Sequence, residues 1–221
     1  MNTFEIIKKL KEGNRYQLEY YSLGILFRRL SIYLTPLFIY LKCSANVTTL
    51  IALVVGLSAG MLLIIYGYSV YFYSVLLYFL HILIDHCDGN IARLNNTPSF
   101  FGRFIDGLFD TLVIGFLQIA MFYILLNDKI FIDSNIFNYL EYDLVIIIII
   151  TSIFLTPIQH LIYDRYSAYI RWINFEHESK LSPTLKNEIS LKIINLLDDH
   201  NFGFILIILG MFSINFIILY F

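Results

Sequence analysis

The sequence contains little charge and few cysteines, which form the disulfides of small extracellular proteins and bind structural zinc. Only 14% of its 221 residues are Asp, Glu, Lys or Arg, and it has four prolines, two cysteines and one tryptophan. Cys43 and Cys87 do not define a disulfide framework, and no further Cys or His at ligand spacing supports a zinc site. Without internal repeats or a basic aromatic platform, neither a repeat architecture nor nucleic-acid binding is indicated.

Hydrophobic residues, by contrast, make up 58% of the chain and are concentrated in long runs. A helix that crosses a bilayer needs about 20 mostly apolar residues. The runs therefore predict an all-α, polytopic transmembrane helix bundle of five to six spans. The five clearest predicted spans are residues 47–66, 70–91, 100–126, 144–163 and 202–221.

The first 45 residues are predicted to form helices at the membrane surface, before a transmembrane domain over residues 46–221. Phe4, Ile7 and Leu10 alternate with lysines, as in a short interfacial amphipathic helix. A second helix over residues 18–41 is expected to break at Pro36. This helix would either gate the entry of lipid or serve as a simple anchor.

The most informative pattern places four aspartates near the ends of two predicted spans. Since a helix advances about 100° per residue, each half of the pattern lies on one helix face. The turn-forming segment 94–99, with Ser99 as a cap, predicts an antiparallel hairpin that brings the four carboxylates together. The pattern reads Asp85-x-x-Asp88-Gly89-x-x-Ala92-Arg93, then eight residues, then Gly102-x-x-x-Asp106-x-x-x-Asp110.

Carboxylates beside hydrocarbon are costly unless they are paired, metal-bound or hydrated, so the four aspartates indicate a functional site. Four neighbouring carboxylates repel one another, and a hard divalent cation with oxygen ligands removes that conflict. Mg²⁺ is commonly shared between carboxylates and phosphates, and Arg93 adds a fixed fork of donors for phosphate. The pattern therefore predicts metal-dependent phosphate chemistry.

This pattern resembles the signature of the CDP-alcohol phosphotransferases, D-x-x-D-G-x-x-A-R-x(8)-G-x-x-x-D-x-x-x-D, at every fixed position. The segment Ser44-Ala45-Asn46-Val47-Thr48-Thr49-Leu50 is also similar to the family's S-P-N-x-x-T-L, with alanine in place of proline. The family pattern covers roughly residues 26–126. Where the family has a fifth span, segment 188–200 is instead interpreted as an amphipathic cytoplasmic helix, because it carries Lys192, Asp198 and Asp199.

The resemblance implies a catalytic site as well as a fold. Asp110 is expected to be the general base, and one or two Mg²⁺ or Mn²⁺ ions are the implied cofactors. The implied metal ligands are Asp85, Asp88, Asp106 and Asp110. The implied CDP-binding residues are Asn46, Thr49, Asp85, Gly89, Ala92, Arg93 and Gly102.

The implied reaction transfers a phosphatidyl group from a CDP-linked donor, CDP-diacylglycerol, to an alcohol in phospholipid biosynthesis, with release of CMP. The alternative is transfer from CDP-choline or CDP-ethanolamine to diacylglycerol. An ion or proton-coupled transporter is disfavoured, because the aspartates do not recur across the membrane and no inverted repeat is present. Membrane lipids are expected partners, and a homodimer is possible.

Basic residues predict the orientation of the bundle. All Lys and Arg except Lys129 lie before residue 47, around residues 93–103, or after residue 163. Because cytoplasmic loops carry an excess of Lys and Arg, the aspartate hairpin is expected to face the cytoplasm.

Two further features have packing explanations. Gly56 and Gly60 form a G-x-x-x-G pattern that is expected to allow close packing of helices within the chain. His81, one turn before Asp85, is either a packing residue or a group beneath the metal site.

Overall fold

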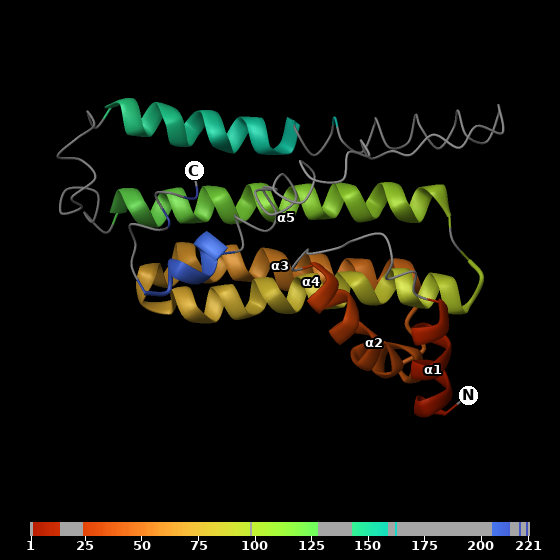
Figure 1. The fold of residues 1–221 in the computed structure, drawn as a ribbon. Helices are drawn as coiled ribbons and strands as arrows, with labels where there is room; N and C mark the ends of the chain where they lie inside the picture. The colour runs from red at the N-terminus through yellow and green to blue at the C-terminus, as the bar shows by residue number, and fades with distance from the viewer. Residues whose placement is uncertain are drawn as a thin grey trace, which may run out of the picture.

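The computed structural model describes residues 2–13, 24–97, 99–127, 143–158 and 205–212, with residues 162, 217 and 220. Helices are the only regular secondary structure in this part of the chain, which confirms the all-α prediction (Figure 1). A further helix covers Asp143–Ile158. The labelled elements are α1 (Thr3–Gly13), α2 (Gly24–Tyr40), α3 (Ala45–Tyr66), the 3-10 helix η2 (Gly67–Val70), α4 (Tyr71–Leu94) and α5 (Phe100–Asn127).

Local sequence signals fix the ends of the central helices. Ser44 caps α3 by accepting a hydrogen bond from the Val47 amide at 3.3 Å, and Ser99 caps α5 by accepting one from the Gly102 amide at 2.9 Å. The predicted cap at Ser99 is thereby confirmed. Gly67 ends α3 with a φ of 69°, a conformation that glycine adopts without steric cost.

Among the described residues, two helical stretches are long and apolar enough to cross a membrane, Ala45–Leu94 and Phe100–Asn127. The first folds back at η2, so that α3 and α4 pack side by side (Figure 1). The helices α3, α4 and α5 correspond to the predicted spans 47–66, 70–91 and 100–126. Large hydrophobic side chains remain exposed along α3, among them Leu50, Val54, Met61 and Ile65. An apolar surface of this extent is typical of a helix that faces lipid.

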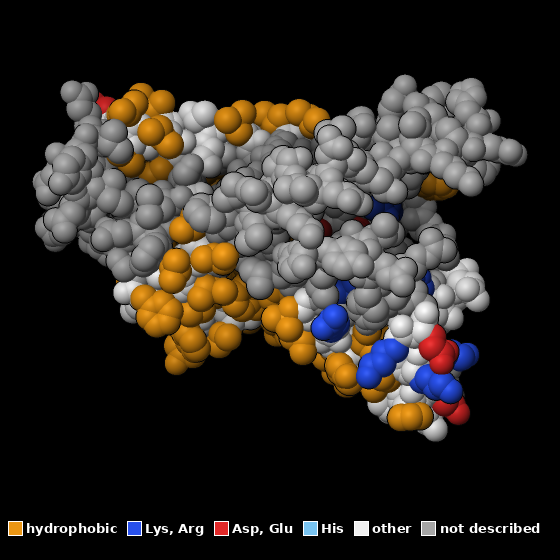
Figure 2. Space-filling model, viewed as in Figure 1, with side chains coloured by type: hydrophobic (Ala, Val, Ile, Leu, Met, Phe, Trp, Pro, Cys, Tyr) orange, Lys and Arg blue, Asp and Glu red, His pale blue; other side chains and the backbone are white. Residues whose placement is uncertain are grey.

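Charged side chains lie apart from this apolar surface. In Figure 2, the described Lys, Arg, Asp and Glu side chains gather mainly over α1, whereas hydrophobic side chains cover the visible parts of α3 and α4. This separation is consistent with one polar end on an otherwise apolar bundle.

The helix α3 packs against both α4 and α5, because small residues let the backbones approach closely. A Cβ atom added at Gly56 would lie 2.6 and 2.7 Å from the two methyl carbons of Val113 on α5. At Gly60, an added Cβ atom would lie 2.6 Å from Cδ1 of Phe116. The G-x-x-x-G pattern thus packs within the chain, as predicted.

Replacing Gly56 with Ala is expected to destabilise the fold by about 1–3 kcal/mol, because the stiff, fully buried side chain of Val113 must move. The melting temperature in detergent measures this effect. Ser58→Thr is the matched control, since it adds one methyl group to an exposed position of the same helix. Equal melting temperatures for the two variants would show that the α3–α5 contact tolerates the added carbon.

The two N-terminal helices differ from the prediction in detail. The helix α2 continues through Pro36 to Tyr40, so the predicted break at Pro36 is wrong. A proline removes only one helical hydrogen bond and, so near the helix end, most of the ladder remains. In α1, Ile6 and Leu10 are buried against Ile32 of α2, whereas Phe4 is 76% exposed. The apolar face of α1 is therefore turned towards α2.

The C-terminal prediction is not reproduced as one continuous helix. Residues 205–209 are helical, but a turn follows at residues 210–212, inside the predicted span 202–221. Tyr68 donates a hydrogen bond to the Gly210 carbonyl at 2.7 Å, and Tyr71 donates one to the Ile207 carbonyl at 3.2 Å. These bonds to α4 and η2 hold the turn in place. The predicted helix at residues 188–200 lies outside the described residues.

Candidate active site

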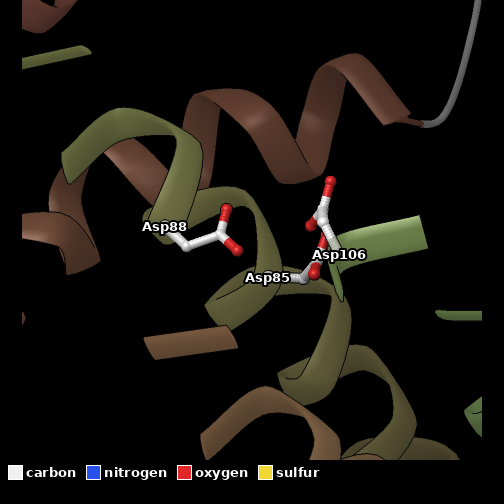
Figure 3. Close-up of side chains that lie close together, drawn as sticks. All are labelled: Asp85, Asp88 and Asp106. Carbon is white, nitrogen blue, oxygen red and sulfur yellow. The ribbon is translucent and has the colours of Figure 1, made fainter. Parts of the chain in front are cut away.

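Three carboxylates from two helices converge at one end of the bundle. Asp85 and Asp88 come from α4 and Asp106 comes from α5, and each offers an oxygen within 4.8 Å of the other two (Figure 3). Asp85 and Asp88 share a face because three residues are close to one helical turn. Three negative charges this close are unfavourable without a cation between them.

The fourth aspartate lies beside this cluster and not within it. Asp110 is one turn further along α5, and its side chain is 38% exposed. One of its oxygens lies 3.6 Å from Nε2 of His81, and Nδ1 of the same ring donates to the Ala52 carbonyl at 2.9 Å. The buried His81 is therefore oriented by α3 and lies next to Asp110. Of the two predicted roles, packing residue or group beneath the metal site, this position agrees with the second.

A cavity of about 450 Å³ opens over these carboxylates. Every metal-binding, CDP-binding and catalytic residue predicted from the sequence lines it. These residues are Asn46, Thr49, Asp85, Asp88, Gly89, Ala92, Arg93, Gly102, Asp106 and Asp110.

The N-terminal turn of α3 completes one wall of the cavity. The Thr49 hydroxyl is within hydrogen-bond reach of Asp88 and of the Ala45 carbonyl. A Cβ atom at Gly102 would lie 3.0 Å from the Ser99 hydroxyl and 3.5 Å from the Asn46 amide oxygen. Glycine at this position thus lets the start of α5 approach the start of α3.

Some residues of the cavity were not among the predicted site residues. Arg28 of α2 reaches the cavity although it precedes the aspartate motif by more than 50 positions in the chain. The other additional lining residues are Ala45, His86, Thr97, Ser99 and Arg103. His86 on α4 and Arg103 on α5 occupy variable positions of the motif, so the signature does not mark them.

The cavity is lined by charges of both signs. Asp85, Asp88, Asp106 and Asp110 contribute carboxylates, and Arg28, Arg93 and Arg103 contribute guanidinium groups. The three convergent carboxylate oxygens fit a hard divalent cation such as Mg²⁺ or Mn²⁺, which prefers oxygen ligands. Guanidinium groups suit phosphate oxygens. The cavity can therefore accommodate a cation together with a phosphorylated ligand.

Comparison with known proteins agrees with this chemistry. A family model described as CDP-alcohol phosphatidyltransferase matches residues 42–181. The chain belongs to this family. No curated protein matches the sequence.

Membership of the CDP-alcohol phosphatidyltransferase family implies a transferase of substituted phosphate groups, with a CDP-linked donor and an alcohol acceptor. The matched residues include all of α3, α4 and α5 and therefore the four aspartates. The apolar helices and the family together support a membrane location.

Proposed function

We propose that the protein is a polytopic membrane enzyme that transfers a phosphatidyl group from CDP-diacylglycerol to a polar alcohol and releases CMP. The main support for this proposal is that carboxylates and guanidinium groups line one cavity. Such a cavity can bind a pyrophosphate-linked donor, because the cation and the guanidinium groups neutralise its charge. Homodimer formation stays a prediction.

In this proposal Asp85, Asp88 and Asp106 hold the divalent ion, and Asp110 lies beside this group on the next turn of α5. A bound Mg²⁺ or Mn²⁺ ion would neutralise the charge that develops on the pyrophosphate oxygens. Asn46, Thr49, Gly89, Ala92, Arg93 and Gly102, together with Asp85, would surround the CDP group.

Asp110 is the proposed general base. Its carboxylate lines the cavity outside the three-carboxylate cluster and is partly exposed, so an acceptor hydroxyl can reach it. It would take the proton of that hydroxyl while the acceptor oxygen forms a bond to the β-phosphorus of the donor. The bond between this phosphorus and the bridging oxygen breaks, and CMP leaves with the bond's electrons.

The proposed cavity opens to the cytoplasm. The helices α1 and α2, which carry five Lys and Arg residues over the described ranges 8–11 and 26–29, lie near the α4–α5 connection in Figure 1, and Arg28, Arg93 and Arg103 line the cavity with the carboxylates. An excess of Lys and Arg is typical of the cytoplasmic side. A nucleotide conjugate with a lipid tail would thus reach the cavity from the membrane, with its cytidine in water.

The reaction is tested by measuring CMP release from purified protein in lipid nanodiscs with Mg²⁺. We expect release with CDP-diacylglycerol and a pool of polar alcohols, and none with CDP-choline and diacylglycerol. Release from the second pair alone would indicate an aminoalcohol phosphotransferase. Release from neither pair, accompanied by ion-dependent flux in liposomes, would favour a transporter.

A further inference from the structure

A fully buried polar network connects α2 to the aspartate-bearing helix α4. Asn90 occupies a variable position of the motif, between Gly89 and Arg93, and is 0% exposed. Its amide nitrogen donates to the hydroxyls of Ser31 at 3.1 Å and Thr35 at 2.9 Å, both on α2. Its amide oxygen accepts a hydrogen bond from Nη2 of Arg93 at 2.8 Å.

Donor and acceptor chemistry permits only one orientation of the Asn90 amide. The Ser31 hydroxyl donates to the Arg28 carbonyl at 2.9 Å, and the Thr35 hydroxyl donates to the Ser31 carbonyl at 2.7 Å. Each hydroxyl has a single proton, so both present lone pairs to Asn90 and require its NH₂ group. Arginine has only donors and requires the carbonyl oxygen. Reversing the amide would break all three bonds.

The surroundings make this network rigid. Ser31 and Thr35 are both 0% exposed, and the helices α2 and α4 contribute Phe38, Ile84 and Ile91 to a buried apolar cluster. A buried polar group that loses its hydrogen-bond partner cannot bond to water instead, so breaking such a bond costs free energy. The amide oxygen of Asn90 is therefore held at one position relative to α4.

Arg93 lines the cavity and is hydrogen-bonded to this oxygen. Its side chain is exposed, and an exposed arginine samples many rotamers unless it is held. The guanidinium lies over Gly89, where an added Cβ atom would be 3.4 Å from Nη1. The bond to Asn90 through Nη2 leaves the other guanidinium donors for a ligand in the cavity.

We propose that Asn90 is a positioning residue that orients Arg93 for binding of the donor phosphate, and that Ser31 and Thr35 of α2 set the orientation of Asn90. This proposal rests on the proposed function, because it requires Arg93 to contact the CDP group. It makes α2 part of the donor site, although α2 contributes no predicted site residue. It also explains why an uncharged, fully buried amide lies between two cavity-lining positions.

The test is a double-mutant cycle on the binding of CMP, which both candidate donors release. Asn90→Leu removes the amide at similar volume, and Arg93→Met removes the guanidinium but retains the apolar stem. We expect each change to weaken CMP binding about tenfold in calorimetric titrations with Mg²⁺. The double variant should bind CMP no more weakly than Arg93→Met alone, because Asn90 acts through Arg93.

Thr35 provides a second test that a general loss of packing would not mimic. Thr35→Val removes the hydroxyl at nearly constant volume, and Thr35→Ser retains it. We expect Thr35→Val to raise the KM for the donor several-fold with kcat little changed, and Thr35→Ser to resemble the parent protein. Thermal melting of each variant shows whether the fold is retained.

The outcomes separate this proposal from the proposed function. If Arg93→Met weakens CMP binding but Asn90→Leu does not, or if the two effects are additive, Asn90 does not position Arg93. The same conclusion follows if Thr35→Ser and Thr35→Val raise KM equally. If Arg93→Met leaves CMP binding unchanged, the assignment of Arg93 to the donor site fails and the proposal fails with it.

Discussion

Replacing Asp110 with Asn is expected to lower the rate of CMP release by about 10²–10⁴-fold, the range that removal of a general base produces. The amide is nearly isosteric with the carboxylate but cannot accept the acceptor's proton. Because Asp110 lies outside the cluster of three convergent carboxylates, the binding of CMP with Mg²⁺ should change little. Steady-state kinetics and calorimetric titration measure the two effects separately.

The matched control is Asp143→Asn, which makes the same chemical change at an exposed position of the helix Asp143–Ile158. It should retain the activity of the parent protein. A variant with Asn at position 110 that still turns over at a comparable rate would remove Asp110 from the role of base. A large loss of CMP binding in this variant would instead place Asp110 among the metal ligands.

The aspartate motif could be predicted because it depends mainly on local geometry. Residues three, four and eight positions apart lie on one helix face, so the sequence alone places Asp85 near Asp88 and Asp106 near Asp110. The turn-forming segment and the cap at Ser99 then bring the start of α5 close to the end of α4. For the same reason, the predicted site residues on α4 and α5 line one cavity.

Features that depend on packing between distant segments could not be predicted in this way. Arg28 enters the cavity because the buried face of α2 packs on α4, and the sequence of α2 contains no signal for that contact. The prediction of a break at Pro36 gave too much weight to the local tendency of proline to interrupt a helix. The helix there is supported by α4, and the neighbouring Thr35 hydroxyl bonds the Ser31 carbonyl. Tertiary contacts commonly override such preferences.

The site depends on α3 as well as on the hairpin formed by α4 and α5. Gly56 and Gly60 bring α3 against α5, while the Ala52 carbonyl orients His81 beside Asp110. Thr49 contacts Asp88 from the same helix. The helix α3 thus supports carboxylates on both α4 and α5, which explains how two helices joined by a short loop keep their acidic faces at a common cavity.

Removing divalent ions with a chelator is expected to abolish CMP release, and adding Mg²⁺ or Mn²⁺ should restore it. The structure also predicts an effect on stability, because three carboxylate oxygens within 4.8 Å of one another repel in the absence of a cation. An ion that binds only the folded state at 100 times its Kd stabilises it by about 2.7 kcal/mol. The melting temperature in detergent should therefore rise on addition of Mg²⁺.

Asp88→Asn tests whether this stabilisation arises at the three carboxylates. The amide oxygen of Asn can still accept the hydrogen bond from Thr49, so the helix packing should be retained. Removal of one negative charge lowers the repulsion, so the variant in chelator should melt no lower than the parent protein in chelator. It should lose most of the rise in melting temperature on addition of Mg²⁺, whereas Asp143→Asn should show the full rise. Equal Mg²⁺-dependent shifts in all three proteins would mean that the ion acts elsewhere, and the carboxylate cluster would then need another explanation.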